Sequence, residues 1–287
     1  MPTLKQVLFA SIQYPLPHHA LSRSMGRLTH CRIPWVKNLL IKGFVWLYDI
    51  NLDEAISADP NDYACFNDFF TRGLRPQARP LCNEPDKIVS PADGFISQLG
   101  NLTGQWLIQA KGKDFSCQAL LGGDAAVSRP FEDGEFATIY LSPRDYHRLH
   151  MPVDGTLKTM IHIPGRLFSV NQATTNVVDG LFARNERVVC VFDTQAGPMA
   201  LVLVGALFVA SIETVWHGVV TPPSGHEVRR WHYEGQNIQL RRGEEMGRFN
   251  MGSTIIVLFG KEAVQWLDFK PGQAIQMGQP IGSLIMS

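Results

Sequence analysis

Hydrophobic and polar residues follow two different patterns along this 287-residue chain. From about residue 86 onward, short apolar runs alternate with turn-forming pairs such as Asp93-Gly94 and Asp154-Gly155, which is typical of β-strands joined by tight turns. The strands predicted from these runs cover residues 136–141, 157–163, 188–192, 200–204, 207–214 and 254–259. Because long helical periodicity is absent there, we expect an α+β fold whose core is mostly antiparallel, either a sandwich or barrel-like.

Two Gly-punctuated segments, 88–99 and 270–284, resemble each other and the hairpins of lipoyl and biotinyl carrier domains. Neither segment has the modified lysine that those carriers hold at a hairpin tip. The resemblance therefore predicts lipoyl-like hairpin elements in the fold and indicates nothing about function.

The first 48 residues have a helical pattern instead. In a helix that begins near Pro34, Asn38 and Lys42 lie on one narrow polar stripe beneath a wide apolar face. This segment contains six basic residues and no Asp or Glu, together with Trp35 and Trp46, a residue type that settles at the headgroup level of membranes. The apolar face could pack on the protein core. However, each basic residue near an anionic leaflet contributes about 1 kcal/mol to the free energy of binding to the membrane, which favours membrane association.

Composition narrows the class of protein. The formal net charge is +0, so the overall field gives no reason to expect a nucleic-acid partner. The five cysteines are scattered and form no CxxC pair, which favours a reducing compartment over a disulfide framework. No stretch reaches the ~20 apolar residues of a spanning helix, and the N-terminus lacks the pattern of a secretory signal. We expect a membrane-association segment over residues 1–62 and a β-rich catalytic domain over residues 63–287.

Ser253 is the first candidate for chemistry. It follows Gly252 at the entrance to the last predicted strand, where glycine leaves the peptide carbonyl open to attack. A Gly-Ser pair alone most often marks a turn. A serine hydroxyl becomes a good nucleophile when a base removes its proton, and a histidine is a good base when a carboxylate orients it. Asp93 and either His147 or His150 supply those residue types.

The two histidines belong to a run from Ser142 to Pro152. Ser142 and Asp145 form a capping-box pattern with proline at the first helical position, which predicts one short helix ended by Pro152. On such a helix His147 and His150 share a face. Histidines at this spacing can also bind a metal ion, but no motif supplies further ligands, so we expect no metal site.

Six motifs occur in order between residues 66 and 259. They are FNDFFTRGLRP at 66–76 with Arg79-Pro80 after it, PADG at 91–94, SPRDYHRLHMP at 142–152, PGRLFSVN at 164–171, LFARNERV at 181–188 and GEEMGRFNMGSTIIVLF at 243–259. Together they resemble the bacterial phosphatidylserine decarboxylases, the pyruvoyl-dependent prokaryotic type I family. One residue differs: Met251 stands where the family usually has leucine, and these two side chains are near-isosteric.

The resemblance implies a lyase of phospholipid biosynthesis. Such an enzyme converts phosphatidylserine to phosphatidylethanolamine and CO₂ through a Schiff base to a pyruvoyl cofactor. The resemblance also implies a zymogen with an Asp-His-Ser triad, which corresponds here to Asp93, His150 and Ser253. The triad cleaves the chain between Gly252 and Ser253, and Ser253 becomes the pyruvoyl group.

The implied products are a β chain of residues 1–252 and an α chain of residues 253–287, which stay together as a heterodimer, with further dimerisation left open. His147 is our candidate for protonating the α-carbon of the substrate or for holding the phosphate or carboxylate of the headgroup. The lipid substrate implies a peripheral location at the anionic, cytoplasmic face of the cell membrane. Six arginines in family-like runs could pair with the headgroup or have surface and structural roles: Arg72, Arg75, Arg79, Arg166, Arg184 and Arg187.

Three other functions remain open at this point. A conventional serine hydrolase could use Asp93, His150 and Ser253, although the sequence lacks a GxSxG nucleophile elbow. A noncatalytic lipid-surface module would need the basic segment and none of the chemistry. Another pyruvoyl-dependent amino acid decarboxylase would share the chemistry but would have no use for the basic, apolar N-terminal segment.

Overall fold

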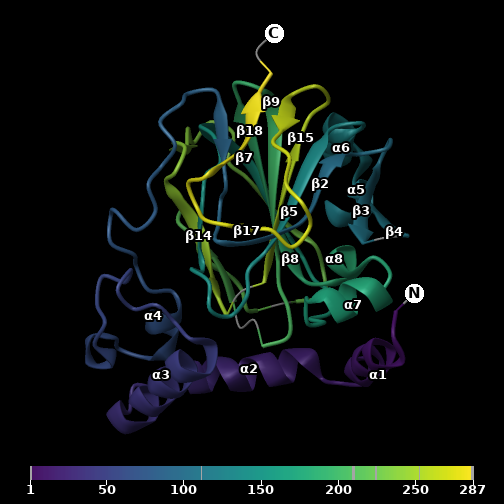
Figure 1. Cartoon of the computed structure of the whole chain (residues 1–287). Coiled ribbons are helices and arrows are strands. Elements are labelled where there is room, and N and C mark those ends of the chain that lie inside the picture. The colour runs from purple at the N-terminus through teal and green to yellow at the C-terminus, as the bar shows by residue number, and fades with distance from the viewer. Residues whose placement is uncertain (1, 111, 209–210, 224, 252, 286–287) are drawn as a thin grey trace.

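The computed structural model describes residues 2–110, 112–208, 211–223, 225–251 and 253–285. Gly252, which forms half of the expected cleavage site, lies outside the described residues. The N-terminal segment forms a layer of helices at one end of a β body that the rest of the chain builds (Figure 1).

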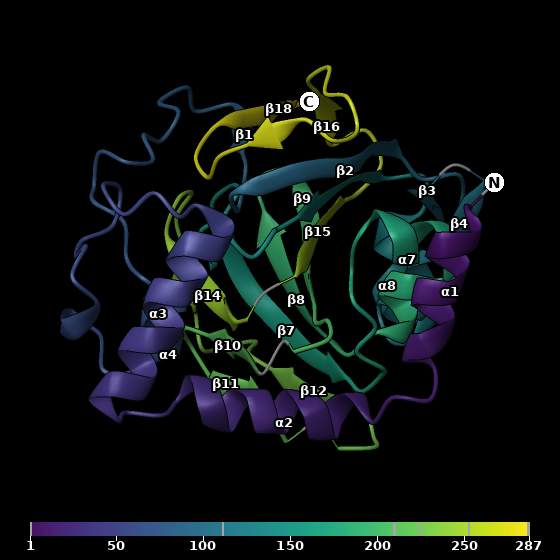
Figure 2. The ribbon, with the colours of Figure 1, turned by 60° about the horizontal axis from the view of Figure 1, so that its bottom comes forward.

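Three helices make up this layer. They are α1 (Leu4–Gln13), α2 (His18–Thr29) and α3 (Pro34–Tyr48). Figure 2 shows the end of the molecule that they cover, with α2 running between α1 and α3. The prediction that a helix begins near Pro34 is confirmed, since proline at the first helical position needs no partner for an N–H group. No helix in the described part of the chain is long and apolar enough to cross a bilayer.

Side-chain hydrogen bonds attach the junction of α1 and α2 to the β body. Gln13 Nε2 donates to Ser169 Oγ at 2.9 Å, and Ser169 N donates back to Gln13 Oε1 at 2.9 Å. His18 Nδ1 accepts from Leu167 N at 3.1 Å, so His18 Nε2 carries the proton that it donates to Gln13 O at 2.7 Å. Gln13 and His18 are both buried, and the helices are therefore fixed where they meet the body.

The inner face of α3 packs on a short aromatic helix, α4 (Phe66–Phe70). The ring centroid of Phe44 lies 5.2 Å from that of Phe66 and 5.8 Å from that of Phe70. Ile41 is fully buried in the same cluster. Part of the apolar surface of α3 is thus used for core packing.

The outer face of the helical layer is also apolar, and it is exposed. Asn38 and Lys42 lie four residues apart in α3 and so share one face of the helix, where Asn38 donates a hydrogen bond to Asn61 and Lys42 is exposed. Large apolar side chains of α3 stand on the exposed side: Trp35, Leu39, Trp46 and Leu47, with Leu4, Leu8 and Ile12 exposed on α1. Exposed large apolar side chains grouped on α1 and on α3 indicate an interaction site.

The β body is built from antiparallel sheets, the largest of which has nine strands within the described residues. Its order is β12-β7-β8-β9-β15-β5-β2-β17, with β13 beside β7. These strands are β2 (Gly94–Asn101), β5 (Glu135–Tyr140), β7 (Gly155–Ile163), β8 (Arg187–Thr194), β9 (Gly197–Val204), β12 (Arg229–His232), β13 (Gln239–Leu240), β15 (Thr254–Phe259) and β17 (Ala274–Ile275).

Three smaller sheets have the orders β11-β10-β14-β6, β1-β18-β16 and β3-β4. Their strands are β1 (Lys87–Val89), β3 (Trp106–Ala110), β4 (Lys113–Ser116), β6 (Arg148–His150), β10 (Ser211–Thr214), β11 (Gly218–Thr221), β14 (Glu245–Asn250), β16 (Val264–Trp266) and β18 (Pro280–Leu284). The remaining helical turns are η1 (Pro60–Asp62), α5 (Cys117–Leu120), α6 (Ala125–Ser128), η2 (Arg129–Phe131), α7 (Gln172–Val177) and α8 (Leu181–Arg184).

This architecture confirms the α+β class and the antiparallel core, and it corrects the details. The large sheet does not close into a barrel among the described strands, because β12 and β17 form its two ends. Short helices interrupt the β body where none was expected. The predicted strand 254–259 coincides with β15, whereas the predicted strand 207–214 is shortened to β10.

The two Gly-punctuated segments pair with each other. β1 pairs with β18, and Gly94 of β2 lies opposite Ile275 of β17. This pairing brings the turn after β17 against the start of β2, where Met277 N donates to Asp93 Oδ1 at 2.8 Å. The C-terminal residues therefore help to build the surroundings of a predicted site residue.

Gly94 is the glycine of β2 at which an added side chain would clash with the neighbouring strand. A Cβ atom there would lie 2.2 Å from Tyr140 O of β5, whereas a Cβ at Gly100 would meet nothing within 4 Å, although both residues have positive φ. We expect Gly94→Ala to lower the free energy of unfolding by about 3 kcal/mol more than Gly100→Ala, as measured by urea denaturation. Equal losses in the two variants would contradict the close β2–β5 approach.

Candidate active site

Strand register places two of the predicted site residues at the same edge of the large sheet. Thr254 of β15 lies opposite Tyr140 of β5, and Tyr140 lies opposite Phe95 of β2. Ser253 therefore precedes β15 at the edge where Asp93 precedes β2. Leu141 N donates to Ser253 O at 2.7 Å. Two inter-strand spacings, about 10 Å, separate the strands on which Asp93 and Ser253 lie.

His150 reaches this edge from the neighbouring sheet. It ends β6 and pairs with Glu245 at the start of β14, whose other end, at Asn250, is followed by Met251. The backbone N–H of His150 donates to Pro91 O at 2.8 Å, in the PADG turn that contains Asp93. His150 thus lies beside the turn that contains Asp93, while Asp93 and Ser253 lie at the same edge of the large sheet.

The short helix predicted between Ser142 and Pro152 is wrong. Asp145 Oδ2 accepts from Ser142 N at 2.6 Å and from Ser142 Oγ at 2.7 Å, so the capping-box residues close a turn instead. The chain then becomes extended because residues 148–150 pair with β14. His147 and His150 consequently do not share a helical face, and they contact different groups.

The hydrogen bonds of His150 define its protonation state. Its Nδ1 lies 2.8 Å from Gly243 O, which can only accept, so Nδ1 carries the proton and Nε2 has a free lone pair. That lone pair faces Tyr146 Oη at 3.1 Å. Burial lowers the pKa of His150 below its ordinary value, which outweighs the opposing effect of the Gly243 hydrogen bond. His150 is therefore a neutral base at physiological pH.

Asp93 does not orient His150 directly in this structure. Its carboxylate is held by Arg79, with Arg79 Nε 2.8 Å from Oδ1 and Arg79 Nη2 2.5 Å from Oδ2. Arg79 also binds Glu54 at 2.8 Å. Within the described part of the chain, no hydrogen bond joins Asp93 to His150. Its negative charge nevertheless raises the pKa of His150, against the larger lowering by burial, so it favours the protonated ring.

Ser253 is 1% exposed, and its Oγ lies 3.4 Å from Thr254 Oγ1. Among the described residues, no hydrogen bond joins Ser253 to His150 or to Asp93. Asp93 and Ser253 thus lie at one edge of the large sheet and His150 lies beside Asp93 in the neighbouring sheet, but no side-chain hydrogen bond among the described residues connects the three.

His147 is fully buried beside this edge. Its Nδ1 donates to Asp145 O at 2.7 Å, its ring centroid lies 4.1 Å from that of Phe70, and its Nε2 has no partner among the described residues. Burial, with a smaller effect from the charge of Arg72, lowers the pKa of His147 to about 3. A buried nitrogen lone pair without a donor is costly, which marks His147 as a proton acceptor that lacks its partner.

Met251 is a feature that sequence reasoning did not find. Its φ of 77° is in the left-handed region, which is strained for a residue with a side chain. The Met251 side chain packs against the aromatic cluster that includes Phe66 and Phe70. Backbone strain of about 1–3 kcal/mol is common at functional sites, and here it lies next to the expected cleavage site. Nothing in the sequence predicts this backbone conformation, because methionine is not a residue type that favours positive φ.

Comparison with known proteins identifies the family. The family model described as phosphatidylserine decarboxylase matches residues 66–283, and a second model, described as PSD, matches residues 8–49. The chain belongs to the phosphatidylserine decarboxylase family.

Three relatives named phosphatidylserine decarboxylase proenzyme illustrate how much of the family's length the chain covers. The protein of Methylococcus capsulatus is 56% identical over 284 residues, which is 99% of each chain. The Azotobacter vinelandii protein is 54% identical over 97% of this chain and 99% of its own. The Bordetella avium protein is 56% identical over 97% of this chain and 95% of its own.

The arginines in the family's motifs have diverse surroundings in this decarboxylase-family chain. Arg187 is buried and donates to the carbonyl oxygens of Ala119, Leu120 and Asn185. Arg166 binds Tyr14 O at 2.5 Å, Arg75 binds Ala55 O at 3.1 Å, and Arg184 is exposed. Arg79 is the counter-ion of Asp93, a role that spacing in the sequence could not reveal. Arg72 is buried, with its Nε and Nη1 unpartnered among the described residues.

Arg79 should be required for the stability of the site. Arg79→Gln leaves the buried Asp93 carboxylate without its counter-ion, and removing one partner of a buried pair costs about 3 kcal/mol of unfolding free energy. The matched control is Arg75→Gln, which removes a charge four residues away and a single bond to a carbonyl, at a cost of about 1 kcal/mol. Urea denaturation of the two variants in a Ser253→Ala background measures the difference. Equal stabilities would argue against Arg79 as the counter-ion.

Proposed function

We propose that this chain is the proenzyme of a phosphatidylserine decarboxylase, which cleaves itself between Gly252 and Ser253 and then converts phosphatidylserine to phosphatidylethanolamine and CO₂. The observation that carries the proposal is Ser253, buried at the entrance to β15 on the sheet edge where Asp93 lies, with the neutral, buried His150 beside the turn that contains Asp93. Membership of the family and the proenzyme names of its relatives support it.

In the proposed self-cleavage, His150 Nε2 removes the proton from Ser253 Oγ. The oxygen attacks the carbonyl carbon of Gly252, and the amide becomes an ester with a free amine on residue 253. Loss of the α-proton of residue 253 then breaks its Cβ–Oγ bond. This step leaves a carboxylate on Gly252 and a dehydroalanine at position 253, which gains water and loses ammonia to give the pyruvoyl group.

Small rearrangements at the site must precede this reaction. His150 Nε2 has to exchange the hydroxyl of Tyr146 for that of Ser253. Nδ1 can keep its bond to Gly243 O, which holds the ring in the tautomer that the base needs. We assign to Asp93 the electrostatic stabilisation of the protonated ring, because its charge favours that form. General-base assistance of this type contributes ~10²- to 10⁴-fold, which suffices for a single-turnover reaction.

A pyruvoyl group at position 253 would supply a ketone that condenses with the substrate amine and withdraws electrons as CO₂ departs. The residues around position 253 suit this chemistry because they exclude water and hold neutral histidines. We assign to His147 the removal of a proton from the substrate ammonium and its return to the α-carbon. Its Nε2 presents a lone pair in a ring that is neutral before the reaction and can therefore accept a proton, whereas a neutral ring does not suit the alternative role of holding an anion.

The helical layer supports a peripheral location on the cytoplasmic face of the cell membrane. Trp46 is 84% exposed and Trp35 is 71% exposed on a surface flanked by basic residues, as in interfacial helices. We therefore keep residues 1–62 as a membrane-association segment and residues 63–287 as the catalytic domain, which matures into a β and an α chain. The lipoyl-like character of the two paired Gly-punctuated segments is a proposal about fold only.

Self-cleavage provides the first test. On denaturing gels the wild-type chain should separate into fragments 1–252 and 253–287, with pyruvoyl at the start of the small fragment by intact mass. Ser253→Ala should remain one chain, and His150→Ala should cleave at least about 10²-fold more slowly. A stable, unprocessed wild-type chain with hydrolase activity would favour the serine hydrolase instead.

The pH dependence of cleavage follows from the lowered pKa of His150. The reactive form is the neutral ring, and burial places its pKa below the ordinary 6.5. The first-order rate of self-cleavage, measured after cell-free synthesis, should therefore stay constant as the pH falls through 6.5. It should decrease only at a lower pH, where the buried ring becomes protonated. A rate that halves near pH 6.5 would show that the ring is not protected by burial.

The membrane role is tested by changes on the exposed face rather than by deleting helices that pack on the body. Trp35→Ser with Trp46→Ser should lower activity on anionic vesicles at least about tenfold, because both rings lose their place in the interface. Activity on a monomeric short-chain substrate should not change. Ile108→Ser, which removes an exposed apolar residue of β3 away from the helical layer, is the control. Equal loss on both substrates would exclude an interfacial role.

A further inference from the structure

A groove runs beneath α2, between this helix and strands β10 and β11. It has a volume of about 450 Å³, and α2 contributes Arg23, Arg27 and the following His30 to its wall. A smaller cavity continues from it, since Ser22 and Arg23 line both. The groove therefore opens in the same helical layer that exposes the apolar faces of α1 and α3 (Figure 2).

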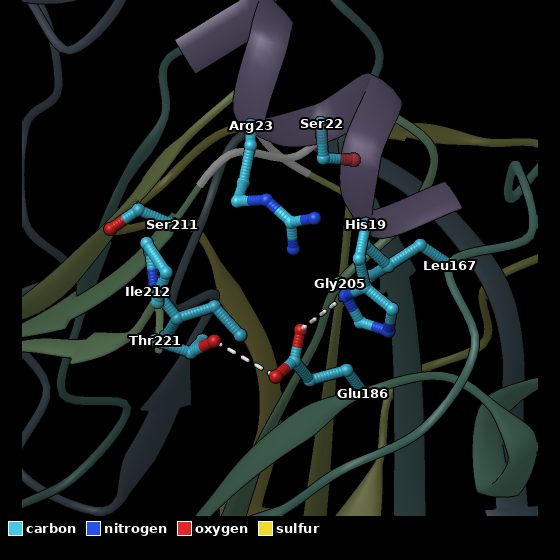
Figure 3. Close-up of a pocket in the computed structure, with 10 residues that line it drawn as sticks. His19, Ser22, Arg23, Leu167, Glu186, Gly205, Ser211, Ile212 and Thr221 are labelled. Carbon is cyan, nitrogen blue, oxygen red and sulfur yellow. Dashed lines mark hydrogen bonds and ion pairs between the residues drawn. The ribbon is translucent and has the colours of Figure 1, made fainter. Parts of the chain in front are cut away.

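One wall of the groove is cationic. Arg23, Arg27 and His30 follow each other at intervals of four and three residues, which places them on one face of the helix. Neither arginine forms an ion pair or a side-chain hydrogen bond with another described residue. Figure 3 shows Arg23 pointing from α2 into the cavity above Glu186. That carboxylate is already bonded to His162 Nε2 and Thr221 Oγ1, each at 2.8 Å.

The inner end of the groove leads toward the candidate active site. Asn67 of α4 and Asn250 of β14 line it there. Asn67 Nδ2 donates to Asn250 Oδ1 at 2.9 Å, and Asn250 Nδ2 donates to Ser211 Oγ at 3.0 Å. Asn67 is 7% exposed, and its Oδ1 has no hydrogen-bond partner among the described residues. Asn250 is followed by Met251, next to the expected cleavage site.

The groove thus offers two chemistries among its lining residues. Guanidinium groups bind phosphate oxygens through charge-assisted hydrogen bonds. A buried amide oxygen without a donor suits an ammonium group, which has three N–H donors and no acceptor. A phosphodiester that bears an amine, as in an aminophospholipid headgroup, has both groups within a few bonds of each other.

We propose that this groove binds the headgroup of an aminophospholipid, with Arg23 and Arg27 on the phosphate and Asn67 Oδ1 on the amine. The proposal rests on the proposed function and extends it. It gives the headgroup a route from the bilayer surface, under α2, to the chain segment that precedes Ser253. The acyl chains stay in the bilayer while the headgroup enters.

Binding by a soluble headgroup separates this site from general attraction to an anionic surface. Full-length Ser253→Ala protein is titrated with glycerophosphoserine by calorimetry, without any membrane. Arg23→Gln with Arg27→Gln should weaken binding at least about tenfold, the loss expected when charge-assisted hydrogen bonds are removed. Asn67→Leu should weaken glycerophosphoserine binding but leave glycerophosphoglycerol binding unchanged, because the latter has no amine.

The control pair is Arg32→Gln with Arg129→Gln. Both residues are exposed and lie outside the groove, so this variant loses the same charge and should bind like the parent. Equal weakening in the two double variants would overturn the proposal, as would the absence of saturable binding. Competition by inorganic phosphate at equal concentration would show an adventitious ion site only and would also overturn it.

Enzyme activity gives a second test, on the wild-type chain and the groove variant with Ser253 intact and self-cleavage complete. With monomeric short-chain phosphatidylserine, the groove variant should show a KM raised about tenfold and an unchanged kcat, and its self-cleavage should be normal. A lowered kcat with an unchanged KM would overturn the groove. If the wild-type protein released no CO₂, the proposed function would fail, whereas the titrations would still report on the groove.

Discussion

β15 is hydrogen-bonded along its whole length to β5 on one side and to β9 on the other, and each of its six residues is buried. The position of Ser253 depends on this strand, because Ser253 immediately precedes its first residue, Thr254. The same pairing explains how residues 253–287 can remain attached after the proposed cleavage. Besides β15, they contribute β17 to β2 and β18 to β1, so the small fragment is part of the sheets and cannot leave without unfolding them.

The chemistry of the site follows from burial. His147 and His150 both present an unprotonated Nε2, and in both rings a carbonyl oxygen holds the proton on Nδ1. Burial keeps both rings neutral. The site thus contains two bases: His150, whose Nε2 faces Tyr146 Oη, and His147, which lies beside the ring of Phe70 and whose Nε2 has no partner among the described residues. Asp93 is neutralised by Arg79, so its charge acts on His150 from a distance rather than through a hydrogen bond.

Local sequence predicted those elements whose residues decide their own structure. The β-branched run 254–259 became β15, and Pro34 became the first residue of α3, because these signals depend on nearest neighbours. The helix predicted from Ser142 onward did not form, for the opposite reason. Residues 148–150 obtain their hydrogen bonds from β14, about a hundred residues away in the sequence. The Asp93–Arg79 pair, the strain at Met251 and the groove beneath α2 also come from long-range packing. Only the motif resemblance pointed to the triad.

The residues on the two sides of the proposed cleavage site are held by different parts of the structure. On one side Ser253 leads directly into the buried strand β15. On the other side Met251 packs on the aromatic cluster of α4, and Phe70 of that cluster also contacts the ring of His147. Phe44 of α3 packs on the same cluster. A single set of aromatic contacts therefore connects the helix that exposes Trp35 and Trp46 to both the strained residue and the unpartnered base. A displacement of α3 would therefore reach the site through packed side chains, because protein interiors are close-packed.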